Sequence, residues 1–168
     1  SLHLHFAKEC KQEQALKLIE AWAPHLYKLQ AFYLYTPTLN DKTAVFIKKS
    51  FPALRYFSLH SEKKESLGPE ICYEIADSHS SQELLHLSLI GTHIGDKGQL
   101  ALVMSEHLSY LRHLDLRDGI LGNNSSRILT AQHRLRSLAS LDLRYNQIDD
   151  LGLHELKKLN IHVELDFQ

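Results

Sequence analysis

The chain has 168 residues, of which 43% are hydrophobic and 23% charged, and its formal net charge is −1. These values fit one globular domain or one repeat array, and they exclude wholesale disorder and a polycationic binder of nucleic acids or membrane surfaces. No apolar run approaches the roughly 20 residues that span a bilayer. Two cysteines, Cys10 and Cys72, are too few for a disulfide scaffold and favour a reducing, cytoplasmic compartment.

An alternating segment, Leu2-His3-Leu4-His5-Phe6, opens the chain and predicts a strand. No basic segment followed by an apolar one precedes it, so we expect no signal peptide. A repeated Leu-x-x-Leu-x-Leu pattern follows, with its first leucine at Leu29, Leu54, Leu84, Leu111 and Leu138. Leu4 and Phe6 take the last two apolar positions in a partial first unit. Val163 and Leu165 take the same positions in a partial last unit.

These positions predict a single domain, residues 1–168, built from repeats of about 27 residues. The predicted units are 1–28, 29–53, 54–83, 84–110, 111–137 and 138–159, with a partial unit at 160–168. Alternating leucines predict a short strand in each unit, and the rest of a unit is long enough for a helix. A small residue falls fourteen positions after each first leucine position, at Ala15, Thr43, Gly68, Gly98, Ser125 and Gly152. We expect neighbouring backbones to crowd there, where the chain turns into each helix.

The full pattern, L-x-x-L-x-L-x-x-N-x-L, resembles the leucine-rich-repeat signature, and its best copy runs from Leu138 to Ile148. The repeat length and the Gly-containing turn are similar to the ribonuclease-inhibitor-like class. This resemblance implies an α/β solenoid of about six or seven repeats, a curved horseshoe with parallel strands on the concave face and helices on the convex face. The chain departs from the signature because only Asn146 fills its asparagine position. Glu9, Pro37, Glu62, Thr92 and Gly119 fill the others, so we expect irregular turns.

Non-leucine positions of each strand should point to the concave face, in ladders about 4.8 Å apart. The candidate partner-binding residues there are Tyr33, Tyr35, Tyr56, His60, Arg112, Asp115, Arg117, Asp118, Asp142, Arg144 and Tyr145. Tyrosine and arginine often anchor interfaces, so this composition predicts protein recognition. A second interpretation remains open for Asp115, Arg117, Asp142 and Arg144. These four could instead pair with one another in a surface network that contributes little stability per pair.

Catalytic and cofactor motifs are absent from the sequence, which contains no H-E-x-x-H, C-x-x-C or phosphate-binding P-loop. His86 and His113 fall at one position of adjacent strands with Asp115 nearby, which is a weak metal signal. Ser88, His113 and Asp115 also suggest a serine–histidine–aspartate group, but an open sheet offers neither an oxyanion hole nor exclusion of water. We therefore assign no catalytic residue, no metal site and no cofactor, and we expect both cysteines to be buried structural thiols.

Histidine is unusually frequent, with twelve residues. Six fall on predicted strands: His3, His5, His60, His86, His113 and His162. The others, at His25, His79, His93, His107, His133 and His154, are scattered over predicted helices and loops without ligand spacing. We therefore expect binding through the concave face to change between about pH 5 and 7, where imidazole titrates.

The repeat pattern favours a non-enzymatic module that binds a partner protein on its concave face, with no nucleic-acid or membrane partner. Degenerate arrays of this kind resemble bacterial effector proteins, which implies action in the host cytoplasm after secretion, and also fragments of cytosolic innate-immune sensors. Another alternative is the substrate-recruiting region of a larger enzyme such as a ubiquitin ligase. Leu2, Leu4 and Phe6 would also leave an apolar edge if nothing covered them, which suggests self-association.

Overall fold

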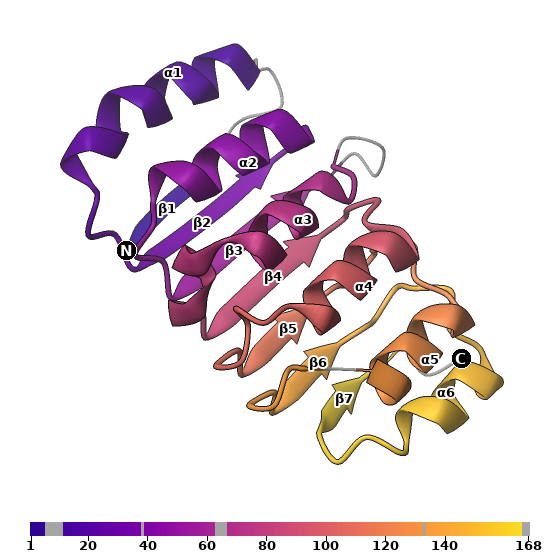
Figure 1. Cartoon of the computed structure of the whole chain (residues 1–168). Coiled ribbons are helices and arrows are strands. Elements are labelled where there is room, and N and C mark those ends of the chain that lie inside the picture. The colour runs from indigo at the N-terminus through magenta and orange to yellow at the C-terminus, as the bar shows by residue number, and fades with distance from the viewer. Residues whose placement is uncertain (6–11, 38, 63–66, 133, 166–168) are drawn as a thin grey trace.

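Strands and helices alternate along the chain in a computed structural model that describes residues 1–5, 12–37, 39–62, 67–132 and 134–165 (Figure 1). The strands are β1 (Leu2–His5), β2 (Ala31–Thr36), β3 (Tyr56–Ser61), β4 (His86–Ile90), β5 (His113–Asp115), β6 (Ser140–Asp142) and β7 (His162–Glu164). The α-helices are α1 (Gln12–Trp22), α2 (Asp41–Ser50), α3 (Glu70–Asp77), α4 (Gly95–Met104), α5 (Asn123–Gln132) and α6 (Asp150–Leu156). Two short 3₁₀ helices, η1 (Ala23–His25) and η2 (His79–Glu83), follow α1 and α3.

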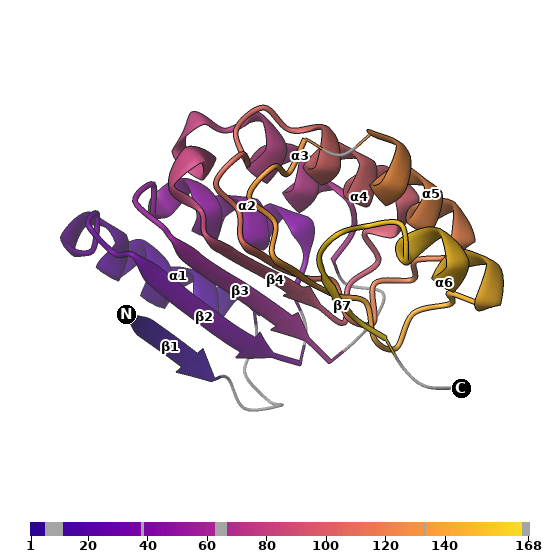
Figure 2. The same ribbon diagram turned by 90° about the horizontal axis from the view of Figure 1, so that it is seen from below.

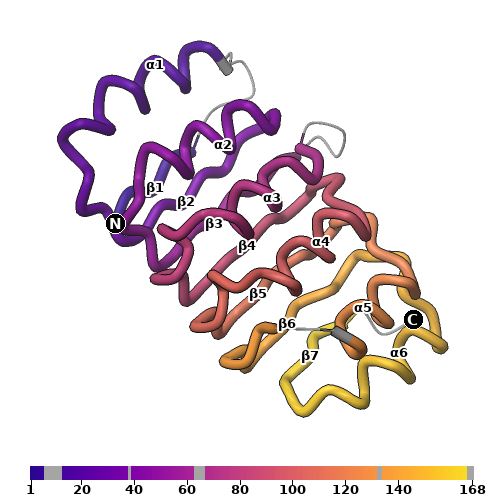
Figure 3. Tube along the Cα trace, viewed as in Figure 1, coloured from indigo at the N-terminus to yellow at the C-terminus, as the bar shows by residue number. Residues whose placement is uncertain are grey.

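The seven strands form one open parallel sheet in which spatial order equals chain order. All six α-helices cover the same side of this sheet (Figure 1). Seen from below, they follow a wider arc than the strands (Figure 2), and the Cα trace repeats the same coil along the array (Figure 3). The other side of the sheet is therefore an uncovered inner surface, which we call the concave strand face. The alternating α/β architecture predicted from the leucine pattern is confirmed.

Leucines stacked from strand to strand form the core between the sheet and the helices. Leu87, Leu114 and Leu141 lie opposite one another in β4, β5 and β6, and each is at most 1% exposed. Ile71 and Leu102 complete the same core from α3 and α4. Burying one such side chain contributes about 1.5–3 kcal/mol. A single unit has no layer of its own to cover these side chains, so the stack is stable only as an array.

The register between β1 and β2 differs by two residues from the one that the repeat pattern predicts. Leu2 lies opposite Phe32 and Leu4 opposite Leu34, whereas the repeat pattern assigns Leu4 and Phe6 to these positions. A shift of two residues keeps every side chain on the same face of a strand, so the alternating pattern cannot choose between the two registers. Phe6 itself lies outside the described residues.

Crowding at the small-residue positions is confirmed. A Cβ atom on Gly98 would lie 2.9 Å from the Cβ of Ile94 and 3.1 Å from the Sγ of Cys72. A Cβ atom on Gly152 would lie 2.5 Å from the Oδ1 of Asn123. Real Cβ contacts are longer than these, so a larger side chain would force neighbouring repeats apart.

Polar side chains join the starts of successive helices. The Oδ1 of Asn40 accepts a hydrogen bond from the Thr43 amide at 2.9 Å and so caps α2. The carboxylate of Asp41 accepts from the Gly68 amide at 2.8 Å and from the Ile71 amide at 3.2 Å. One carboxylate on α2 thereby satisfies two backbone donors at the start of α3.

Asn146, at the asparagine position of the signature, forms hydrogen bonds to backbone groups of two successive repeats. The Nδ2 of Asn146 donates to the carbonyls of Leu116 and Leu143, both at 2.9 Å. Its Oδ1 accepts from the amides of Gly119 and Leu121 at 2.9 and 3.1 Å. A single side chain therefore holds the turns of two successive repeats together, as the signature requires.

Candidate partner-binding face

The predicted partner-binding residues lie on or beside the strands. Tyr33 and Tyr35 are in β2, Tyr56 and His60 in β3, Asp115 ends β5 and Asp142 ends β6. The remaining predicted residues flank the two short strands, with Arg112 before β5, Arg117 and Asp118 after it, and Arg144 and Tyr145 after β6. Asp118 and Tyr145 occupy the left-handed region, with φ angles of 54° and 61°, and so belong to the turns that leave these strands.

Imidazole and phenol rings alternate over the first strands of the concave strand face. The ring of His3 stacks on Tyr33, with centroids 4.3 Å apart and planes 9° apart. Tyr35 lies edge-on between His5 and His60, at centroid distances of 4.5 and 4.7 Å. These rings line a shallow hollow of about 380 Å³. Aromatic contacts of this geometry fix ring orientation, and they leave a surface of well-ordered, amphipathic side chains.

A second row of rings begins with Tyr56 at the amino ends of the central strands. Its centroid lies 6.0 Å from that of His86, which lies 4.9 Å from that of His113. The Nδ1 of His113 is 2.6 Å from the Oγ of Ser140. The predicted meeting of His86 and His113 is confirmed. The rings extend over three strands, and Ser140 continues the row on β6.

Charged residues of the second half pair with one another. Arg117 contacts Asp115 at 2.8 Å and Asp142 at 3.2 Å. Arg144 contacts Asp142 at 2.6 Å and Glu164 at 3.0 Å. Each arginine thus bridges two carboxylates on successive strands. The pairing interpretation of these residues is confirmed, and it leaves them little charge to offer a partner.

Burial shifts the acid–base behaviour of two concave histidines. It lowers the pKa of His60, and the charge of nearby Arg117 lowers it further. Burial also lowers the pKa of His86, and the adjacent His113 acts in the same direction. Asp115 opposes both shifts without reversing them. Both imidazoles are therefore mainly neutral at pH 7 and add no positive charge to the face under those conditions.

The side chains considered above as catalytic or metal-binding candidates form hydrogen bonds that link neighbouring strands. The Oγ of Ser88 donates directly to Asp115 at 3.1 Å, and His113 bonds Ser140 instead, so no histidine connects serine and aspartate. Within the described ranges, no group of three or more His, Cys, Asp or Glu side chains could hold a metal ion. Cys72 is a buried free thiol whose pKa is raised by burial, as expected for a structural cysteine; Cys10 lies outside the described residues.

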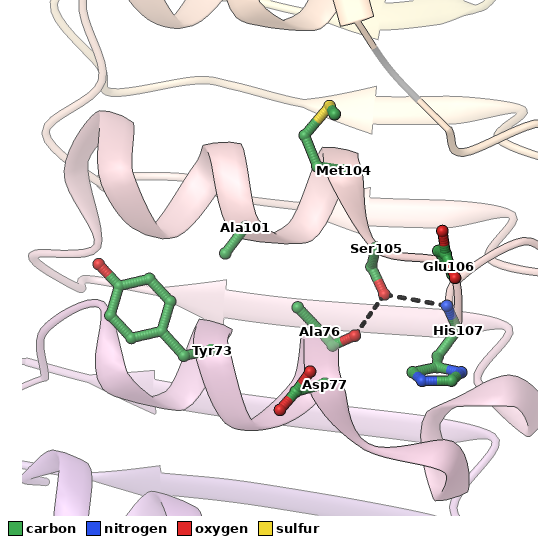
Figure 4. Close-up of a pocket in the computed structure, with 8 residues that line it drawn as sticks. All are labelled: Tyr73, Ala76, Asp77, Ala101, Met104, Ser105, Glu106 and His107. Carbon is green, nitrogen blue, oxygen red and sulfur yellow. Dashed lines mark hydrogen bonds between the residues drawn. The ribbon is translucent and has the colours of Figure 1, made fainter.

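A second hollow, of about 390 Å³, opens between α3 and α4 on the helix side (Figure 4). It is lined by Tyr73, Ala76, Asp77, Ala101, Met104, Ser105, Glu106 and His107. At one end, the Oγ of Ser105 donates to the Ala76 carbonyl at 2.6 Å and accepts from the His107 amide at 3.1 Å (Figure 4). The hydroxyl thus joins the ends of two helices, which is a structural role.

One histidine pair was not predicted from the sequence. His79 and His107 were expected to be scattered over helices and loops, yet their ring centroids lie 4.3 Å apart on neighbouring repeats. Their separation of 28 residues along the chain is close to the repeat length, and that spacing is the signal that could have found them.

The fold and this face define an open α/β solenoid built from repeats. A family model described as Leucine Rich repeat matches residues 134–161, where the signature is best preserved. The described residues therefore have the fold of an α/β leucine-rich-repeat solenoid, with about six or seven repeats. No curated protein matches it. Among the described residues, no helix is long and apolar enough to cross a bilayer.

Proposed function

We propose that this protein binds a partner protein on its concave strand face and acts by recognition and not by catalysis. Leucine-rich repeats generally mediate protein–protein interaction. The observation that carries the proposal is the contrast between the two halves of the face. In the charged half, Arg117 and Arg144 are paired with carboxylates. In the aromatic half, the rings of Tyr33 and Tyr56 contact neighbouring imidazoles.

Aromatic rings of this kind suit an interface because they bury a large area and lose little conformational entropy on binding. Tyr56 is 39% exposed although it lies in a central strand. Exposed, ordered aromatic groups that gather on one uncovered surface indicate an interaction site.

The test compares tyrosines on the two sides of the sheet. Tyr33→Ala/Tyr56→Ala removes two rings from the concave strand face, and Tyr73→Ala/Tyr110→Ala removes two exposed rings from elsewhere. Each variant, checked for folding by circular dichroism, is used to capture partners that are then identified by mass spectrometry. We expect the first pair to lose a partner that the second pair retains. Equal capture by both variants would contradict the proposal.

We further propose that the module acts in a reducing cytoplasm, as a bacterial effector protein in a host cell. The degenerate, cysteine-poor repeats support this context, and the buried free thiol of Cys72 is compatible with it. The full-length gene and its genomic neighbourhood test the idea. A secretion system beside the gene would support it, and a gene from an animal immune locus would contradict it.

A further inference from the structure

We propose that the amino-terminal ends of β3, β4 and β5 bind an acidic segment of the partner, with two carboxylates three residues apart. The proposed site, which we call the arginine–imidazole strip, consists of Arg55, Tyr56, His86, Arg112 and His113. This inference rests on the proposed concave-face function and specifies the chemistry of the partner.

Backbone hydrogen bonds place the two arginines in one row across three strands. The Arg55 carbonyl accepts from the Leu85 amide at 2.9 Å, and the Leu85 carbonyl accepts from the Arg112 amide at 2.9 Å. The next residue of each strand forms the ring row described above, in which Tyr56, His86 and His113 follow one another. Arg55 and Arg112 thus come one residue before the first and third rings of that row.

The charge of these two arginines is uncompensated. In the part of the chain that the structure describes, neither Arg55 nor Arg112 forms an ion pair, whereas Arg117 and Arg144 each bridge two carboxylates. The nearest carboxylate along β5, that of Asp115, is held by Arg117. The Nε of Arg55 is buried without a hydrogen-bond partner. A guanidinium in this condition gains most from an incoming anion.

The other polar groups of the strip are also donors or can become donors. The ring nitrogens of His86 and the hydroxyl of Tyr56 have no hydrogen-bond partner among the described residues. The carboxylate closest to the strip, that of Asp115, is neutralised by Arg117, so it does little to repel an acidic segment. Charge complementarity therefore selects a carboxylate-bearing peptide in preference to a basic one.

The distance between Arg55 and Arg112 further restricts the conformation of the partner segment. Arg55 and Arg112 are two strands apart, which corresponds to about 9.6 Å between their Cα atoms. A polyproline II segment repeats its side-chain direction every third residue, with a rise of about 9.3 Å over that interval. Acidic residues at positions i and i+3 of such a segment would meet the two guanidinium groups across the imidazole of His86.

The probe that tests this is a synthetic peptide with glutamate at every third position and proline and serine between them. Its control carries glutamine in place of each glutamate. Titration into ¹⁵N-labelled protein should shift the amide signals of residues 55–56, 85–86 and 112–113, and only with the glutamate peptide. Arg55→Gln/Arg112→Gln should weaken binding at least about tenfold. The matched control Arg127→Gln/Arg136→Gln, on the helix side and in a loop, should not.

Equal binding of the two peptides, shifts confined to helices, or unchanged affinity in Arg55→Gln/Arg112→Gln would each overturn the inference. Because Arg112 is exposed, Arg112→Gln alone keeps the test valid if the double variant does not fold. If binding of a captured partner requires Tyr33 and Tyr56 but neither arginine, this inference is overturned and the proposed function stands. If binding is unchanged in both the tyrosine and the arginine double variants, the inference and the proposed function are both overturned.

Discussion

Arg117 forms a two-point ion pair with Asp115, with Nε 2.9 Å from Oδ1 and Nη2 2.8 Å from Oδ2. The same guanidinium reaches Asp142 on the next strand. Both carboxylates are only 15% exposed. Asp142 also pairs with Arg144, whereas Asp115 has no second cation among the described residues. Arg117 therefore links two neighbouring strands of the sheet through its ion pairs.

Removing this arginine should reduce stability. Arg117→Ala leaves the mostly buried carboxylate of Asp115 without a cation, and we expect the free energy of unfolding to fall by about 1–2 kcal/mol. Arg112→Ala, which removes an arginine without an ion pair among the described residues, should change it by less than about 0.5 kcal/mol. Urea denaturation measures both values. Equal effects of the two substitutions would show that the network contributes nothing.

The start of α4 should not tolerate a methyl group. Gly98→Ala would place a Cβ atom 2.9 Å from Ile94 and 3.3 Å from the Cα of Pro69, so we expect a loss of about 1–3 kcal/mol in the free energy of unfolding. Gly122→Ala is the matched control because its Cβ atom meets only a carbonyl oxygen, at 3.9 Å. Thermal unfolding compares them, and a Gly98 variant as stable as the control would refute the crowding argument.

The buried amine of Lys48 should make the free energy of unfolding depend on pH in the alkaline range. Its side chain is 1% exposed and donates to the Oγ of Ser80 at 2.7 Å. Burial lowers its pKa from 10.5 to about 8, although Glu74 opposes the shift. The unfolded chain then binds more protons than the folded one between these values, so stability rises as pH increases from about 8 to 10.5.

Comparison with Lys48→Met isolates this effect, since methionine has a similar length and no charge. The unfolding free energy of the native protein relative to the variant should increase by up to about 3 kcal/mol over that pH range. At pH 7 the variant should be at least as stable as the native protein, because no charge has to be buried. A difference that stays constant from pH 7 to 10.5 would contradict the lowered pKa.

Binding of the acidic probe should strengthen on acidification. His86 is faced by Tyr56 from β3 and by His113 and Asp115 from β5, and Arg55 and Arg112 come directly before those two strands. Its lowered pKa keeps it neutral at pH 7, and a bound carboxylate would favour protonation. We therefore expect affinity for the glutamate peptide to rise as pH falls from 7 to about 5.

The control for this pH dependence separates concave histidines from others. His86→Gln/His113→Gln should flatten the pH profile of binding, whereas His154→Gln, on exposed α6, should leave it unchanged. Peptide anisotropy at several pH values measures all three proteins. An affinity that does not vary with pH in the native protein would show that the histidines have no role in binding.

The leucine pattern was enough to predict the sheet, because a 27-residue step brings Leu87, Leu114 and Leu141 into register and buries them together. It could not decide β1. There the run Leu2–Phe6 alternates over three apolar residues, and registers two residues apart bury the same face. The observed choice brings His3 onto Tyr33, a contact that only the folded neighbours reveal.

The sequence predicted which residues lie on or beside the concave strand face but not which of them pair with one another. The repeat frame placed Arg117 and Arg112 on one face, and it predicted a partner contact for Arg112 but left both a partner contact and surface pairing open for Arg117. Cross-strand distances separate them, since Arg117 is held between Asp115 and Asp142 whereas Arg112 has no such pair among the described residues. Sequence alone does not determine these contacts, because they depend on the side-chain rotamers that the packed strands allow.

The most direct test of concave-face recognition is site-specific photo-cross-linking. A p-benzoylphenylalanine in place of Tyr56 is compared with one in place of Tyr73, each mixed with the captured partner and irradiated. We expect a covalent complex from the Tyr56 position on the concave strand face and none from the Tyr73 position on α3. A complex formed only from the Tyr73 position would contradict the proposed binding face.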